Sequence, residues 1–417
     1  MDGSLRRIRS FTPIEEAVSI LVASVRDARR VERVDADASL GRVLATAITA
    51  ERNYPEYDTS HMDGFALNHR DTLNASEERP ARLRIAGSIE AGARHRPELA
   101  RGAAMRVLTG APLPLGADTV VAQEEVKLAG DYIHVKRPVR AGENIDPAGA
   151  DIREGEVLLG AGHRIRPQDL ALLHYLGLRW VEVFHRPRVA LLVVGDELTD
   201  DLEEAARGKV FNTHRRVIEP LTRAAGCEVR YLGIMPDNAE LVGQKLREAL
   251  ASHDVILTIG GSSVSEKDAT SLALRRIGAE RIVQGLAIQP GRVGGFAIAN
   301  GKPIILLPGL IMSTINVFLF LAYPLLKYMQ GLEPTPYHKR LRARLAEDVR
   351  ISRYVDFKKV VWVRLEERGE ADYLCYPQLG ESSRMSIPVR SHGFIVINEG
   401  VEHVERGAEV VVNLPPT

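Results

Sequence analysis

The chain has 417 residues, of which 45% are hydrophobic and 26% charged, and its 55 basic residues balance its 55 acidic residues. This length exceeds one ordinary hydrophobic core and predicts about two to four domains of a soluble globular protein. The balanced charge gives no electrostatic reason to expect binding to nucleic acid or to an anionic membrane.

The only two cysteines, Cys227 and Cys375, lie far apart without metal-type spacing, so each is expected to be a buried small residue in a reducing compartment. The chain begins without the apolar segment of a secretory signal. Its most apolar run, 310–326, is short for a bilayer span and contains Asn316 and Pro324. This run is predicted to be a buried core or interface helix, and the protein is expected in the cytoplasm.

The first predicted element is a helix that begins near Thr12. Thr12 is the expected N-cap, Pro13 suits the first helical position, and Glu15 completes a capping box. Apolar residues then recur on one helical face: Ile14, Val18, Leu21 and Val25.

Residues 51–150 alternate short apolar runs with turns rich in Gly, Pro and Asp, which predicts a β-rich region. The expected strands are 81–86, 103–108, 119–122 and 132–135, and a strand near 156–159 and a helix over about 167–176 follow.

From about residue 186 to residue 330, strands alternate with helices. The run 188–194 is continuously apolar, as in a strand covered on both faces. The other expected elements are helices 213–225, 238–251, 267–277 and 312–329, and strands 228–234, 254–259, 281–287 and 303–307. This alternation predicts a doubly wound α/β domain with a mostly parallel sheet. After a linker at 331–336, short strands predict a C-terminal β-barrel or sandwich.

The segment from Tyr57 to Leu67 is the richest in polar chemistry. Between Asp58 and Gly64 it carries two carboxylates, two hydroxyls and an imidazole. Asp63-Gly64 is a turn signal, because glycine accepts a positive φ at little cost. A turn that exposes a carboxylate beside hydroxyls suits cation binding or a polar substrate, and the alternative is an ordinary polar loop.

Two expected strands of the α/β region end in polar sequence, where open α/β sheets bind ligands. Strand 188–194 is followed by Gly195-Asp196-Glu197, and strand 254–259 by the turn 260–265. This second turn can present N–H groups and hydroxyls to an anion, and the nearby acids, with Asp268, can hold a divalent cation. The alternatives are a plain strand-to-helix connection and, for Asp268, an acid favoured by the helix dipole.

Other polar positions leave structural and functional interpretations open. Asn212 precedes a helix and suits an N-cap as well as a ligand contact, and His214 is expected at the surface. Thr109, in the tight loop 108–114, and Asp151, in a glycine turn, suit turn chemistry as well as binding. The sequence contains no Cys/His metal cluster, phosphate-loop motif, hydrolase elbow or dinucleotide fingerprint.

Taken together, these segments resemble the molybdopterin molybdenumtransferase family, also called the MoeA or gephyrin E-domain family. The resemblance runs from about residue 10 to residue 413. The segments that carry it follow in the family's order: Ser60 to Ala66, Arg106 to Pro114, Gly116 to Asp118, Gly142 to Ile145, Gly149 to Ile152, Gly195 to Leu198, and Gly260-Gly261. Each motif alone is weak, but ordered matches at compatible spacing are specific.

The resemblance implies an elongated subunit of α/β plus β class with four domains, some of them discontinuous. These are an α/β pterin-binding domain (1–28 with 183–333), a linking α+β domain (29–50 with 153–182), a β-rich domain (51–152) and a C-terminal β-barrel domain (334–417). It also implies a homodimer whose active cleft lies between the α/β domain of one subunit and the β-rich domain of the other. A molybdopterin-adenylating protein or domain is the implied partner.

The implied activity belongs to molybdenum cofactor biosynthesis. The enzyme inserts molybdate or tungstate into adenylylated molybdopterin and releases AMP with the help of Mg²⁺, which acts as a Lewis acid and template. The catalytic residues carried over are Asp63, Thr109, Asp151, Glu197 and Asp268, with Glu197 and Asp268 as metal ligands. The implied cofactor-binding residues are Gly195, Asp196, Asn212, Gly260, Gly261, Ser262, Ser263, Pro290, Gly291, Arg292, Ser383 and Ser386.

The chain departs from the family in the segments expected to bind anions. Residues 260–265 read Gly-Gly-Ser-Ser-Val-Ser where the family has Gly-Gly-Val-Ser-Val-Gly, and residues 289–293 read Gln-Pro-Gly-Arg-Val where it has Lys-Pro-Gly-Lys-Pro. The family's Pro-Gly-Asn-Pro turn is Pro-Gly-Leu-Ile at 308–311, and His61 stands where alanine is common. The alternative function is therefore a catalytically altered paralogue that binds pterin as a carrier or scaffold.

Overall fold

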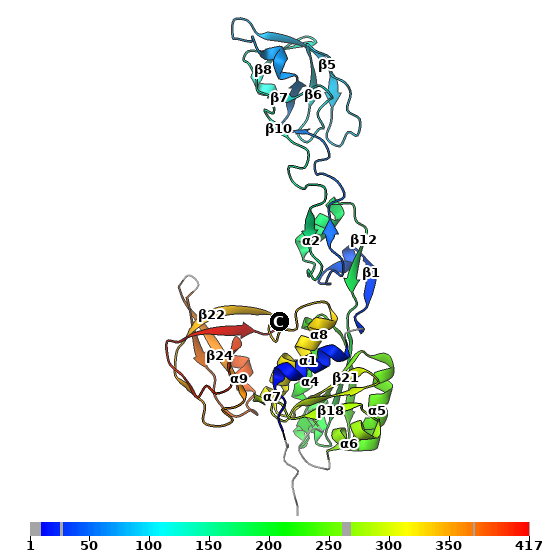
Figure 1. Cartoon of the computed structure of the whole chain (residues 1–417), viewed down its shortest axis with the longest axis vertical. Coiled ribbons are helices and arrows are strands. Elements are labelled where there is room, and N and C mark those ends of the chain that lie inside the picture. The colour runs from blue at the N-terminus through cyan, green and yellow to red at the C-terminus, as the bar shows by residue number, and fades with distance from the viewer. Residues whose placement is uncertain (1–9, 26–27, 261–267, 370–371, 417) are drawn as a thin grey trace, which may run out of the picture. The chain divides into compact units, whose positions relative to one another are not determined.

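The computed structural model (Figure 1) describes residues 10–25, 28–260, 268–369 and 372–416. Its contacts divide the chain into two compact units, one formed by Thr46–Ala161 and the other by Met1–Ala45 together with Gly162–Thr417. The first unit is therefore an insertion in the sequence of the second.

The 46–161 unit is built on a six-stranded sheet in the order β7-β4-β6-β5-β9-β8. Apolar side chains cover both of its faces, because Phe65 and Leu67 belong to one cluster and Ala66, between them, to another. The β-rich prediction for this region is confirmed. Its elements are β2 (Ile48–Thr49), β3 (Thr59–Ser60), β4 (Gly64–Leu67), η3 (His69–Thr72), β5 (Ala81–Ile89), β6 (Ala103–Val107), β7 (Thr119–Ala122), η4 (Gln123–Glu125), β8 (Val126–Ala129), β9 (Tyr132–Val135), β10 (Ile145–Asp146) and β11 (Val157–Leu159).

Gly64 is the first residue of β4, and the predicted reason for a glycine here is wrong. Gly64 is not among the glycines with positive φ. A Cβ atom on Gly64 would lie 2.2 Å from the carbonyl oxygen of Val121 in β7. Glycine is therefore required because the backbones of two adjacent strands approach closely at this point.

Gly64→Ala is expected to lower the free energy of unfolding by about 2 kcal/mol, because β4 lies inside the sheet and the added methyl group displaces it. The measurement is urea unfolding followed by circular dichroism. Gly160→Ala is the matched control in the same unit, since a Cβ there meets no atom within 4 Å. Equal unfolding midpoints for the two variants would contradict the close approach.

The larger unit contains a small α+β part. In it β1 (Val31–Asp35) pairs antiparallel with β12 (Trp180–Phe184), and η2 (Asp37–Ser39) and α2 (Pro167–Tyr175) lie between them in the sequence. The buried carboxylate of Asp169 accepts from the Arg166 backbone and side chain, which secures the first turn of α2. These bonds hold the pKa of Asp169 well below its usual value.

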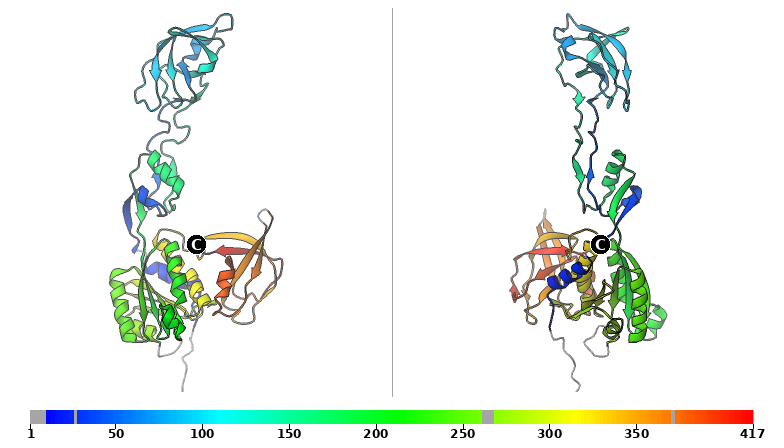
Figure 2. Two further views of the ribbon diagram at one scale, coloured as in Figure 1. Left: turned by 180° about the vertical axis from the view of Figure 1, so that it is seen from behind. Right: turned by 45° about the vertical axis from the view of Figure 1, so that its right-hand side comes forward.

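The α/β part contains a six-stranded sheet in the order β16-β13-β17-β21-β20-β18, in which the first four strands are parallel. Helices α1, α4 and α7 to α8 pack on one face, and α5 and α6 on the other (Figures 1 and 2). The doubly wound prediction is confirmed. The elements are α1 (Ile14–Ser24), β13 (Arg188–Val194), β14 (Leu198–Thr199), α3 (Leu202–Ala206), β15 (Val210–Phe211), α4 (Thr213–Ala224), β16 (Glu228–Met235), α5 (Ala239–Ser252), β17 (Val255–Ile259), α6 (Ala269–Arg276), β18 (Arg281–Gln284), β19 (Ile288–Gln289), β20 (Gly295–Ala299), β21 (Lys302–Leu307), α7 (Ile311–Val317), η5 (Phe318–Ala322) and α8 (Tyr323–Met329).

The predicted Thr12 cap of the first helix is wrong. The N-cap position is occupied by Pro13, which makes no side-chain capping bond. Thr12 instead pairs through its backbone, donating to the Gly285 carbonyl at 3.0 Å and accepting from the Ala287 N–H at 2.8 Å. Thr12 thus forms a parallel β-bridge with Leu286, which fixes the chain just before α1.

Strand β20 was not predicted, and β18 ends three residues earlier than the predicted strand 281–287. β20 runs antiparallel to both β18 and β21. A Cβ on Gly295 would lie 2.1 Å from the Val283 carbonyl oxygen. Glycine allows this close contact between strands, but in the sequence it weakens the strand signal.

The apolar run 310–326 belongs to the continuous helical segment α7-η5-α8, in which η5 is a π-helical turn. The segment Ile311–Met329 is long and apolar enough to pass for a membrane span, yet 89% of an 18-residue stretch of it is buried inside the structure. The prediction of a buried core helix is confirmed. Within it, Asn316 Oδ1 accepts from Trp362 Nε1 at 3.0 Å, and Asn316 Nδ2 donates to the Pro290 carbonyl at 3.0 Å.

The C-terminal part is a closed five-stranded barrel, since β24-β25-β22-β28-β26 is completed by pairing of β24 with β26. The barrel prediction is confirmed, and β19 of the α/β part pairs with β24. Cys375 in β25 and Cys227 are both buried, and burial raises the thiol pKa of Cys227 and brings that of Cys375 to about 11. The elements are β22 (Lys339–Leu345), β23 (Val349–Arg350), β24 (Lys358–Gly369), β25 (Asp372–Pro377), α9 (Ser386–Arg390), β26 (Gly393–Ile397), β27 (His403–Val404) and β28 (Glu409–Leu414).

Candidate functional site

Asp63 lies in the turn between β3 and β4, where Thr109 holds its carboxylate. The Thr109 backbone N–H and hydroxyl each donate to Asp63 Oδ1 at 2.8 Å. These bonds favour the charged form and lower the pKa of Asp63 below its usual value. Both side chains are exposed. Both bonds are made to Oδ1, and among the described residues no hydrogen bond occupies Oδ2, so this second oxygen is available to a ligand.

Buried Ser60 explains how two residues so distant in sequence meet. Its carbonyl accepts from the Gly110 N–H at 2.8 Å, and its Oγ donates to the Met62 carbonyl at 2.5 Å. The first bond fastens the loop that carries Thr109, and the second shapes the turn that carries Asp63. The structure thus brings together two of the predicted catalytic residues.

Around this pair, the other predicted polar groups are exposed. His61 Nδ1 lies 3.1 Å from Asp146 Oδ1, across the β3–β10 pairing, and both side chains are about half exposed or more. A surface pair of this kind contributes little to stability. Asp151 is exposed in the 147–152 turn, where its backbone N–H donates to the Tyr54 carbonyl at 3.1 Å.

A polar hollow of about 530 Å³ adjoins the Thr109 loop through Gly110. Its basic lining residues are Arg52 and Arg94, and its acid is Glu56, which pairs with Arg52 at 3.3 Å. The 46–161 unit therefore places guanidinium groups in the neighbourhood of an ionised carboxylate. That mixture of charges suits a phosphate that carries a cation.

A second pocket, of about 370 Å³, opens in the α/β part at the carboxyl ends of β13, β17 and β21. Four predicted residues line it: Gly195, Glu197, Asn212 and Gly260. Gly260 is required by the turn, since its φ is +80° and a Cβ would lie 2.4 Å from the Val194 carbonyl oxygen. The rule that ligands bind beyond strand ends is therefore followed here.

Asn212 is buried and begins α4. Its Oδ1 accepts from the Arg215 N–H at 3.3 Å, which confirms the capping interpretation. Its Nδ2 donates to Asp200 Oδ1 and to the Tyr231 hydroxyl, both at 3.2 Å. Asn212 is thus held in one orientation at the wall of the pocket, and its ligand contact stays a prediction.

Asp237 also lines this pocket and was not predicted. Its N–H donates to Asp196 Oδ1, and the Asp196 N–H donates to Asp237 Oδ2, each at 3.3 Å. The two loops that follow β13 and β16 are therefore held to each other. Since Asp237 follows a strand end, the rule that pointed to Glu197 could have found it.

Asp268 is buried at the N-cap of α6, where its side chain accepts from the Ser271 N–H at 2.8 Å. This is the structural role that the sequence left open, and the metal role stays a prediction. Gly261, Ser262 and Ser263 lie outside the described residues. Within the described ranges there is no group of three or more His, Cys, Asp or Glu side chains that could hold a metal ion.

The predicted basic group of the α/β side, Arg292, is not among the residues that line the pocket, although its neighbour Val293 is. The Arg292 guanidinium is 5.1 Å from the ring centroid of Tyr354, and Pro290 and Gly291 precede it in the loop between β19 and β20. Of the described residues that line the 370 Å³ pocket, none is Lys or Arg. The anion-binding roles of residues 290–292 stay predictions.

Ser383 and Ser386 are exposed at the start of the α9 region. The neighbouring Ser382 carbonyl accepts from the Met312 N–H at 3.0 Å. This bond places the serine-rich loop beside the first turn of α7, next to Leu310, which lines the strand-end pocket. Ligand contacts of the two serines stay predictions.

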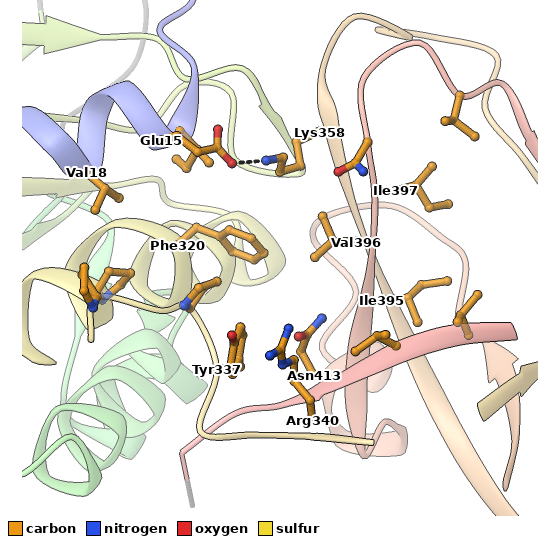
Figure 3. Close-up of a pocket in the computed structure, with 18 of the residues that line it drawn as sticks. Glu15, Val18, Phe320, Tyr337, Arg340, Lys358, Ile395, Val396, Ile397 and Asn413 are labelled. Atoms are coloured by element: carbon orange, nitrogen blue, oxygen red, sulfur yellow. Dashed lines mark hydrogen bonds and ion pairs between the residues drawn. The ribbon is translucent and has the colours of Figure 1, made fainter. Parts of the chain in front are cut away.

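A larger cavity of about 840 Å³ lies between α1, the η5–α8 segment and the barrel (Figure 3). Val18, Phe320 and Ile395 are among its apolar walls, and Glu15 pairs with Lys358 at its rim. None of the predicted site residues lines it. Its apolar character does not suit a phosphate or an oxyanion.

His214 lines the strand-end pocket and is half-buried, so it is less exposed than the surface position that was expected. Burial lowers the pKa of His214 below its usual value, and the Gly309 backbone partly opposes this shift. The sequence did not predict this position, because a histidine in the first turn of a helix is usually expected to face the solvent. Residues 308–310 of the turn after β21 line the same pocket.

Three family models match successive parts of the chain. They are the MoeA N-terminal region (domain I and II) at residues 12–177, the "Probable molybdopterin binding domain" at 190–328, and the MoeA C-terminal region (domain IV) at 342–414. Together they span nearly all the parts described above.

Curated relatives and solved structures agree with these matches. The chain is 31% identical to a molybdopterin molybdenumtransferase of Bacillus subtilis over 97% of this chain and 94% of that protein, and 29% identical to one of Haemophilus influenzae over 96% and 97%. A crystal structure of a molybdopterin biosynthesis MoeA protein from Pyrococcus horikoshii superposes with a TM-score of 0.85 at 29% identity, covering 97% of this chain and 99% of that one.

Proposed function

Because the chain belongs to the molybdopterin molybdenumtransferase family and thus inserts molybdenum into molybdopterin in cofactor biosynthesis, we propose that its substrates are adenylylated molybdopterin and molybdate or tungstate. We further propose that AMP is released, that Mg²⁺ is required, and that the enzyme works in the cytoplasm beside a molybdopterin-adenylating partner. A catalytically altered carrier is not favoured, since relatives that match most of the chain are named as the transferase.

The observation that carries this proposal is the Asp63–Thr109 pair. Two bonds of 2.8 Å keep the carboxylate charged and fixed at an exposed turn. An ionised, immobile carboxylate can orient a cation-bearing phosphate without reorganising during the reaction. The arginines of the adjoining hollow supply the positive charge that an oxyanion requires.

The residues present fit a Mg²⁺ ion that arrives with its substrate. Mg²⁺ is commonly bound through one or two carboxylates, substrate phosphates and water rather than by an all-protein cage. Glu197 is an exposed carboxylate at the strand-end pocket, with Asp237 beside the same opening. We propose Glu197 and Asp268 as its protein ligands. The bound ion would neutralise charge on the pyrophosphate oxygens.

The direct test is AMP release by purified protein from adenylylated molybdopterin with Mg²⁺. Release that requires molybdate or tungstate supports the proposal, and separate arms with each oxyanion identify the preferred one. Omission of Mg²⁺ is expected to stop the reaction. Tight substrate binding without AMP release in any arm would contradict the proposal and would favour the alternative function of a carrier.

We propose that the protein is a homodimer in which Asp63 of one copy and Glu197 of the other serve one cleft. Asp63→Ala and Glu197→Ala, each inactive alone, are then expected to regain about a quarter of the wild-type rate when refolded together, because half of the dimers are mixed and each has one intact cleft. AMP release by the mixture is the measurement. No recovery, with mixed dimers shown by differential tagging, would place both residues in one subunit's site.

A further inference from the structure

The strand-end pocket carries acidic groups but, among the described residues that line it, no Lys or Arg. Its acids are Glu197 and Asp237. The pyrophosphate link of the proposed substrate adds negative charge to the same opening, and a single Mg²⁺ cannot balance both acids and both phosphates. A cationic side chain at the rim would complete the balance of charge.

Lys209 lies at this rim. Its Nζ atom donates to the Asp196 carbonyl oxygen at 2.5 Å. That oxygen belongs to the peptide group that joins Asp196 to Glu197, so the ammonium is within about 5 Å of the Glu197 backbone nitrogen. Gly195 and Glu197, on either side of Asp196, both line the pocket. The ammonium therefore lies beside the opening, although Lys209 is not itself a lining residue.

The pairing of β14 with β15 holds the Lys209 backbone in this place. The two strands are parallel, with Leu198 opposite Val210, and the Val210 N–H donates to the Glu197 carbonyl at 2.8 Å. Because Lys209 immediately precedes Val210, its backbone is fixed against the segment that carries Glu197. The charged end of Lys209 thus starts from a defined position next to a proposed Mg²⁺ ligand.

The ammonium of Lys209 has donors to spare. The side chain is exposed, and among the described residues it forms no ion pair with an acid. An ammonium has three N–H donors, and its bond to the Asp196 carbonyl uses one of them. The remaining donors are open to a ligand that enters from the solvent.

We propose that Lys209 binds a phosphate oxygen of the substrate's pyrophosphate link at the mouth of the strand-end pocket. A lysine ammonium is a compact point charge on a flexible stem, which suits contact with a phosphate. This inference rests on the proposed function and adds to it a residue that the sequence did not indicate. Lys209 binds and orients the phosphate and takes no part in proton transfer.

The test is calorimetric titration of the full-length protein with ADP in the presence of Mg²⁺, and with adenosine, which has the same base and ribose without phosphate. Lys209→Met keeps the length of the side chain and removes its charge. ADP affinity is expected to fall about tenfold or more, the usual effect of losing a charge-assisted hydrogen bond. Adenosine affinity should be unchanged. Lys209→Arg keeps the charge and should recover part of the loss.

Lys302 provides a matched control in the same α/β part. Its Nζ atom donates to the Leu250 carbonyl at 2.6 Å. Lys302 is the first residue of β21, so it lies at the opposite end of that strand from the pocket. Lys302→Met removes the same kind of lysine–carbonyl bond and should leave ADP affinity unchanged.

The salt dependence separates phosphate contact from a structural role. Salt screens an exposed ionic contact, so the ADP affinity of the wild type is expected to fall as NaCl rises, at constant Mg²⁺. The fall should be shallower in Lys209→Met, which lacks the contact, and Lys302→Met should keep the wild-type slope.

Each outcome decides for or against the proposal. Lower ADP affinity confined to Lys209→Met, with adenosine affinity unchanged and a shallower salt dependence, supports it. Unchanged ADP affinity in Lys209→Met, equal losses in Lys209→Met and Lys209→Arg, an equal loss in Lys302→Met, or no ADP binding by the wild type would overturn it. A protein that binds ADP through Lys209 but releases no AMP contradicts only the proposed function, and an active enzyme indifferent to Lys209 contradicts only this inference.

Discussion

Asp63→Ala is expected to reduce AMP release by about 100- to 1,000-fold, which is the usual effect of removing a preorganised electrostatic group from an active site. The reason is geometric: Thr109 fixes one oxygen of the carboxylate with two bonds of 2.8 Å and keeps the group charged. Asp63→Asn retains the shape and loses the charge, so it should be nearly as impaired.

The controls for this prediction lie in the same unit. Asp131→Ala removes another exposed carboxylate, from the turn between β8 and β9, and should leave the rate unchanged. Thr109→Val keeps the backbone donor and loses the hydroxyl, so a smaller loss is expected. Circular dichroism establishes that each variant is folded. A folded Asp63→Ala protein with the wild-type rate would remove Asp63 from the mechanism.

Asn316→Leu is expected to lower the free energy of unfolding of the larger unit by about 2–6 kcal/mol, because two buried groups lose their partners at about 1–3 kcal/mol each. These groups are Trp362 Nε1–H in the barrel and the Pro290 carbonyl, which Asn316 bridges with two bonds of 3.0 Å. Asn316 and Trp362 are both buried, so water cannot readily replace the lost amide.

A double-mutant cycle tests this explanation by urea unfolding followed by circular dichroism. Trp362→Phe removes the indole donor, so the double variant Asn316→Leu/Trp362→Phe should be more stable than the sum of the single losses predicts. Strict additivity would show that the two side chains do not interact. Wild-type stability of Asn316→Leu would show that neither bond matters.

The elements of the α/β core could be predicted from the sequence, because they depend on local patterns of apolar residues. Residues 188–194 were predicted as a strand from their unbroken apolar run, and β13 has the same bounds because helices cover both of its faces. The buried segment α7-η5-α8 was recognised in the same way, although its π-helical turn was not expected.

The errors share a physical cause, which is contact between segments far apart in sequence. Gly64 and Gly295 are glycines because another strand's carbonyl lies 2.1–2.2 Å from where a Cβ would be, and no local pattern reveals this. Thr12 fails as a cap because residues 285–287 occupy its backbone.

The predictions for the candidate site succeeded where the signal was local and failed where it was not. The strand-end rule brought Gly195, Glu197 and Gly260 to one pocket, and it would also have found Asp237. His214 was not predicted as a site residue, because its place in this pocket, beside residues 308–310, brings together segments far apart in sequence.

The burial of both native thiols offers a practical route to measuring the distance between the two units. Thiol reagents attack the thiolate, and the raised pKa values and burial of Cys227 and Cys375 leave them poor targets. Cysteines introduced at Leu128, 61% exposed in the 46–161 unit, and at Val389, 76% exposed on α9, would therefore take up dyes selectively. Energy transfer between those dyes would then measure the distance between the two units in solution, with the natural cysteines left in place.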